Sequence, residues 1–164
     1  MRNLTNIPKA EQERLSEVFP DLVNLICDIG SHDYQTAFVS NFDHCLSREE
    51  ASDLLENVSS EEQKRRNDAF ISFNEELIQS TDCYKVALKG IRKDRVLFKR
   101  FNTKKAALEY INPNAWPHFI VALPEYDAIY HQSWDDTAVV FFINDKVTKY
   151  LENLASKCGL HVYG

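Results

Sequence analysis

The segment YKVALKGIRKDRVLFKRFNTKK, residues 84–105, decides the fold class. In residues 84–89, Tyr84, Val86 and Leu88 alternate with basic or small residues, and residues 95–101 show the same period of two. This alternation is typical of β-strands, because successive side chains of a strand point to opposite faces. The polar residues 92–94 between the two runs predict a turn, so we expect a β-hairpin.

The chain before this segment has the composition and period of helices. Residues 8–19 and 20–30 favour helices, and capping boxes of the form S-x-x-E at residues 47–50 and 59–62 predict two further helix starts. The second box opens the longest expected helix. Residues 32–43, HDYQTAFVSNFD, are ambiguous, and we assign a short helix there.

The chain after the hairpin returns repeatedly to the strand pattern. Its expected elements are a helix at 104–111, strands at 118–123, 126–132 and 137–143, a helix at about 145–158 and a strand at 160–163. The second half therefore has the order ββαβββαβ. Short turns join most of these strands, so the sheet should be mainly antiparallel, with five or six strands.

These patterns predict an α+β fold in a single domain over residues 1–164. An α-helical first half (about 1–82) packs on a sheet formed by the second half (about 83–164). A separate N-terminal helical domain is the alternative. The composition of the first 83 residues disfavours that alternative, because they are acidic and poor in long apolar stripes.

Composition argues against several functional classes. The four glycines are scattered, whereas phosphate-binding loops need them clustered. The four cysteines form no C-x-x-C pair, which argues against a zinc knuckle or a redox motif. The apolar runs are far shorter than the roughly 20 residues of a membrane span, and the N-terminus has no apolar signal core. We expect a cytoplasmic protein with no cofactor and no contact with membranes; its oligomeric state is left open.

Charge is strongly segregated along the chain. The net charge is −6, but residues 84–105 hold nine basic side chains and one acidic side chain. Residues 1–83 hold 7 basic and 17 acidic side chains, and residues 106–164 hold 3 and 7. The predicted hairpin is thus a basic ribbon in an acidic protein.

Three interpretations of this ribbon compete. It binds nucleic acid, with its cations along a phosphate backbone. It is neutralised internally by the acidic helices of the first half. Or it binds a protein of opposite charge, to which segregated charge would steer it. The candidate partner-binding residues of the ribbon are Lys85, Lys89, Arg92, Lys93, Arg95, Lys99 and Arg100.

A second candidate surface lies at Trp134, Asp135 and Asp136. A tryptophan flanked by acids in a predicted loop is typical of an interaction hot spot. The alternative is a tryptophan that folds back to cover the core while the two acids are solvated.

His118 and His131 are candidate metal ligands or acid–base groups. If residues 124–125 form a two-residue turn, the two histidines lie opposite each other on adjacent strands. The alternative is that they merely stack or form a hydrogen bond. No catalytic motif accompanies them, so catalysis is not the favoured function and no metal is expected.

We therefore expect a small acidic protein that works by binding another protein. A bacterial immunity protein, which blocks a basic toxin, illustrates this class by analogy of size and charge alone. The alternatives are a nucleic-acid-associated protein that uses residues 84–105 and a metal-dependent hydrolase with a site near His118 and His131.

Overall fold

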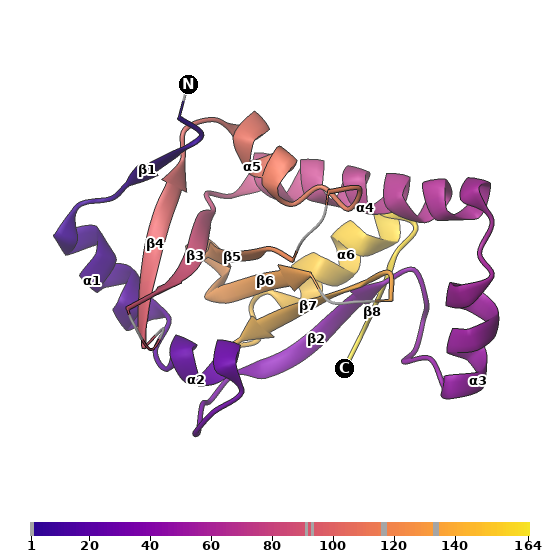
Figure 1. Cartoon of the computed structure of the whole chain (residues 1–164), viewed down its shortest axis with the longest axis horizontal. Coiled ribbons are helices and arrows are strands. Elements are labelled where there is room, and N and C mark those ends of the chain that lie inside the picture. The colour runs from indigo at the N-terminus through magenta and orange to yellow at the C-terminus, as the bar shows by residue number, and fades with distance from the viewer. Residues whose placement is uncertain (1, 91, 93, 116–117, 133–134) are drawn as a thin grey trace.

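The computed structural model describes residues 2–90, 92, 94–115, 118–132 and 135–164. These residues form a mixed α+β structure around one antiparallel sheet (Figure 1). Within the described residues the sheet has eight strands in the order β1-β4-β3-β5-β6-β7-β2-β8, and all neighbours are antiparallel. The strands are β1 (Leu4–Asn6), β2 (Gln35–Ser40), β3 (Tyr84–Lys89), β4 (Arg95–Phe101), β5 (Ile120–Leu123), β6 (Ala128–Gln132), β7 (Thr137–Phe142) and β8 (His161–Tyr163).

The predicted number of strands, five or six, is wrong because the first half of the chain contributes β1 and β2. The segment expected to form a short helix, residues 32–43, contains β2, which lies between β7 and β8. Ala37 and Val39 are buried on one face of β2, while Phe38 stacks on Tyr163 of β8. Apolar side chains on both faces weaken the polar–apolar alternation by which a strand is recognised. The order of helices and strands therefore differs from the predicted order.

The helices begin and end mostly where the sequence indicates. They are α1 (Lys9–Val18), α2 (Leu22–Cys27), α3 (Arg48–Ala51), α4 (Ser60–Ser80), α5 (Lys104–Tyr110) and α6 (Thr148–Cys158). The Ser59 hydroxyl caps α4 by accepting from the Glu62 amide at 3.1 Å, and Gly159 ends α6 with a φ of 76°. None of the described helices is long and apolar enough to cross a bilayer.

The helices form layers on both faces of the sheet (Figure 1). The core of one face joins α4, α5 and α6 to the sheet and contains Phe73 and Tyr130. The core of the other face joins α1 and α2 to the sheet and contains Phe98 and Ile129. Ile129 and Tyr130 are adjacent in β6, so the alternation of the strand places one side chain in each core.

The start of α3 carries a pH-sensitive cluster. The Glu50 carboxylate accepts from the Ser47 amide at 2.8 Å and contacts His44 Nε2 at 2.9 Å, while His44 Nδ1 contacts Asp43 at 2.6 Å. The Ser47 backbone bond, followed by His44, lowers the pKa of Glu50 from 4.5 to about 2. The bond to Asp43, followed by the bond to Glu50, raises the pKa of His44 above 6.5.

This cluster should stabilise the start of α3 most between about pH 4.5 and 6.5. The contribution of Glu50 is present above pH 4.5 and is lost as the pH falls towards 2. The contribution of His44 is present below pH 6.5 and is lost as the pH rises through its higher folded value. Titration of the imidazole resonances by NMR should give a His44 pKa above 6.5 that falls in Glu50→Gln. Glu49→Gln, which removes a neighbouring exposed carboxylate, is the control; an equal fall there would contradict the assignment.

Candidate functional site

The basic ribbon forms the hairpin β3–β4, and its cations are not evenly divided between the two faces. Lys85 lies directly opposite Lys99, and Lys89 lies directly opposite Arg95. Directly opposed residues share a face, so these four side chains project from the same side of the hairpin. We call this surface, made of Lys85, Lys89, Arg95 and Lys99, the basic face.

The basic face places like charges against each other without neutralising them. Within the described residues, no carboxylate lies within 4.0 Å of any of its four cationic groups. Like charges directly opposite one another destabilise a sheet. The Lys85 ammonium lies 4.7 Å from the centre of the Tyr110 ring, a contact that attracts this cation without cancelling its charge.

The acidic helices neutralise little of this ribbon. Arg100 points to the opposite face from Lys99, and its guanidinium binds Glu11 of α1 at 2.6 Å. Tyr84 also donates to Glu11, and this bond, ahead of the Arg100 contacts, lowers the pKa of the Glu11 carboxyl. Arg92 is exposed in the turn, and Lys93 lies outside the described residues. Arg100 is thus bound to α1, whereas the four cations of the basic face form no ion pair within 4.0 Å in the described chain. Glu13 and Glu17 of α1 line the same hollow as Lys89 and Arg95, but without such a contact.

Apolar side chains occupy the centre of the basic face. Ala87 and Leu97 form the cross-strand pair between the two pairs of cations, and both are half-buried. Neither belongs to the core clusters of the sheet. In Figure 1, α5 lies near the C-terminal end of β4, whereas the hairpin turn lies at the opposite end of the strand. The basic face therefore combines cations with accessible apolar area.

The three residues of the second predicted surface, Trp134, Asp135 and Asp136, do not form one exposed patch among the described residues. Trp134 lies outside the described residues, and Asp135 is exposed. The Asp136 carboxylate is turned inwards, where it accepts from Gln63 at 2.8 Å and from Arg66 at 3.1 Å. Asp136 therefore connects the start of β7 to α4 through hydrogen bonds.

The two-residue turn at residues 124–125, on which the direct pairing of the histidines depended, does not form, and a longer loop changes the register. A 3₁₀ turn at Pro124–Tyr126, followed by Asp127 with a φ of 47°, makes the loop longer. Ile120 rather than His118 consequently pairs with His131. A proline ring fits the first position of such a turn but not a two-residue hairpin loop.

His118 and His131 are nevertheless neighbours, with ring centres 6.2 Å apart. Burial, followed by the charge of His118, lowers the pKa of His131. Within the described part of the chain, no group of three or more histidine, cysteine or acidic side chains could hold a metal ion. The pair therefore has no third ligand among these residues.

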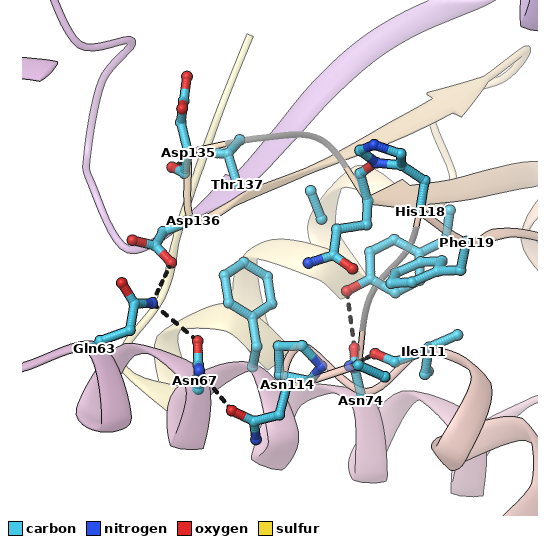
Figure 2. Close-up of a pocket in the computed structure, with 16 residues that line it drawn as sticks. Gln63, Asn67, Asn74, Ile111, Asn114, His118, Phe119, Asp135, Asp136 and Thr137 are labelled. Atoms are coloured by element: carbon cyan, nitrogen blue, oxygen red, sulfur yellow. Dashed lines mark hydrogen bonds between the residues drawn. The ribbon is translucent and has the colours of Figure 1, made fainter. Parts of the chain in front are cut away.

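A cavity of about 390 Å³ lies between α4, the segment after α5 and the ends of β6 and β7 (Figure 2). Its wall on α4 is made by Gln63, Asn67, Phe70 and Asn74, which follow one another at helical spacing. His118 and Phe119 lie across the cavity from this wall (Figure 2). The cavity was not predicted from the sequence, although three carboxamides on the core-facing stripe of a helix are a visible signal.

Hydrogen bonds hold the carboxamides of this wall in place. Gln63 donates to Asn67 at 3.1 Å, and Asn67 donates to Asn114 at 2.7 Å (Figure 2). At the bottom, Asn74 donates to the carbonyl of Ile111 at 2.9 Å and accepts from the Tyr130 hydroxyl at 2.8 Å. Burial raises the pKa of this tyrosine, so the hydroxyl remains a donor. The wall is therefore polar and preorganised.

Comparison of the chain with protein-family models, with curated proteins and with solved structures gives no significant match. The basic face and the cavity are the two surfaces whose chemistry and geometry distinguish this molecule.

Proposed function

We propose that this protein acts by binding an acidic surface of another protein through the basic face of the β3–β4 hairpin. The observation that supports this proposal is the two like-charge cross-strand pairs, Lys85 with Lys99 and Lys89 with Arg95, none of whose cations has a carboxylate within 4.0 Å in the described chain. A sequence that stabilises its own fold would avoid both pairings. Such local conflicts are expected at functional sites.

An acidic partner would relieve this repulsion on binding. Its carboxylates would offset the opposed cations, and Ala87 with Leu97 would provide apolar contact at the centre. Segregated charge would also accelerate the encounter, an effect that salt weakens. A regulatory or immunity-like protein, which acts by occupying its target, fits this mode of binding.

Two observations favour a protein over a nucleic acid as the partner. The residues outside 84–105 carry a net charge of −14, which would repel a long polyanion. Phe101, an aromatic residue on the same face of β4, packs on Tyr110 with ring centres 5.5 Å apart. It is therefore held by the core rather than presented for stacking on bases.

Reversing one cation of each opposed pair should abolish partner binding while stabilising the fold. In Arg95→Glu/Lys99→Glu, each like-charge pair becomes an attractive pair, worth roughly 0.5 kcal/mol at low salt. Tagged wild-type protein recovered from its native cells should retain a stoichiometric acidic partner that the variant loses. Urea unfolding should show that the variant is at least as stable as wild type.

Arg48→Glu/Lys149→Glu is the matched control, because it makes the same change in charge at two exposed positions on other elements. It should retain the partner. The proposal fails if wild type retains no stoichiometric partner, or if the hairpin variant binds the partner as tightly as wild type does. Salt-sensitive binding of labelled DNA or RNA by wild type, lost in the hairpin variant, would favour the nucleic-acid alternative instead.

A further inference from the structure

We propose that the cavity beside α4 binds an uncharged small molecule whose planar edge carries a hydrogen-bond donor next to an acceptor. Nucleobases and primary carboxamides share this chemistry. The residues that line the cavity are distinct from those of the basic face, so this inference is independent of the proposed function. Its volume of about 390 Å³ lies within the range of small-molecule sites.

The side chains on the α4 wall of the cavity are suited to a ligand that forms hydrogen bonds. The stripe of α4 that faces the sheet carries the buried Phe73, Leu77 and Ile78 at positions that do not line the cavity. Over the cavity it carries Gln63, Asn67 and Asn74. Burying carboxamides lowers stability unless their hydrogen bonds are satisfied, so a wall built only for packing would be aliphatic.

The wall opposite α4 carries a carboxamide that could bind such a ligand. Gln132 of β6 lines the cavity, and its side chain makes no hydrogen bond within the described residues. Its backbone is held, because the amide donates to Phe119 at 3.3 Å. A carboxamide presents one acceptor beside one donor group, which matches the same arrangement on a nucleobase or on another amide.

The charges around the cavity favour an uncharged ligand. Neither lysine nor arginine lines the cavity in the described chain, and the nearby Arg66 is already bound to Glu62 and Asp136. Asp136 is offset by this pair, whereas the exposed Asp135 adds negative charge at one end of the cavity (Figure 2). Phosphates and carboxylates are therefore disfavoured, and the apolar edges of Phe70 and Phe119 favour a flat ligand.

The test is calorimetric titration of the full chain with two matched pairs of probes, adenosine with AMP and nicotinamide with nicotinate. At least one neutral probe should bind with saturation, and its charged counterpart should bind about tenfold more weakly or not at all. Binding of adenosine would identify the nucleobase as the source of the planar edge, and binding of nicotinamide would identify the carboxamide. Gln132→Leu should weaken the neutral probe by about tenfold, because the ligand loses both hydrogen bonds.

Gln79→Leu makes the same chemical change at an exposed position of α4 away from the cavity and should bind as wild type does. If Gln132→Leu does not fold, Gln132→Glu keeps the shape, removes the donor and should show a similar loss. The inference is overturned if wild type binds neither neutral probe at millimolar concentration. It is also overturned if the charged probes bind as tightly as the neutral ones, or if the folded Gln132 variant keeps full affinity.

Discussion

Replacing Arg66 by methionine should lower the free energy of unfolding by about 3–5 kcal/mol. Arg66 is 4% exposed, and its guanidinium binds Glu62 at 3.0 Å and Asp136 at 3.1 Å. It also donates to the carbonyl of Leu54 at 2.9 Å and lies 5.0 Å from the centre of the Phe42 ring. Methionine fills similar space but carries no charge, so the mostly buried Asp136 carboxylate would lose the cation that it binds. Urea unfolding measures the loss.

Arg65→Met is the matched control for this prediction. Arg65 also binds Glu62, at 2.7 Å, but its side chain is 59% exposed. Exposed ion pairs contribute about 0–1 kcal/mol, so the control should lose little stability. Equal losses in the two variants would contradict the assignment of Arg66 as the buried connection between α4 and the β6–β7 turn.

A double variant tests the same connection from its other end. Asp136→Asn removes the charge that Arg66→Met leaves behind, so the combined loss should be smaller than the sum of the single losses. The turn also holds Asp135 and Asp136 at φ values of 69° and 52°, a left-handed conformation that aspartate adopts more readily than most residues other than glycine. The Arg66–Asp136 pair therefore stabilises this turn in addition to the helix contact.

The local elements of this fold could be predicted because their signals are local. Ser59 and Glu62 mark the start of α4 within four residues of sequence, and the alternation in residues 95–101 is complete within one strand. β1 has no such signal: three residues are too few for a period, and the strand exists because Leu4 pairs with Phe101. Pairing over that distance is a property of the whole fold.

In the candidate sites, too, some features have a local sequence signal and others depend on contacts between distant residues. Charge segregation alone indicated the ribbon, but which cations share a face depends on the pairing of Lys85 with Lys99 and of Lys89 with Arg95. The cavity combines side chains of α4 with those of β6 and of the segment after α5. The inward position of Asp136 depends on Arg66, a residue 70 positions earlier. Such arrangements depend on how the elements pack in three dimensions, which the spacing of residues along the sequence does not show.

Replacing Phe98 by alanine should destabilise the protein by about 3–5 kcal/mol, because the ring is fully buried. Phe98 lies on the face of β4 opposite the basic face, where it packs on Phe19 with ring centres 6.1 Å apart. Its backbone amide and carbonyl also bond with the side chain of Gln12 in α1, at 3.0 and 2.7 Å. Loss of the ring would weaken the apolar packing of α1 and α2 on the hairpin, although alanine keeps the backbone bonds to Gln12.

Leu97→Ala is the control for Phe98→Ala, since the two residues are adjacent but point to opposite faces of β4. Leu97 is half-buried and lies outside both core clusters, so its removal should cost less than half as much stability. It should instead weaken partner binding, because Leu97 lies at the centre of the basic face. Chemical denaturation and partner affinity, measured on both variants, separate the two effects. A larger loss of stability in Leu97→Ala than in Phe98→Ala would show that the hairpin faces are reversed and that the proposed surface is wrong.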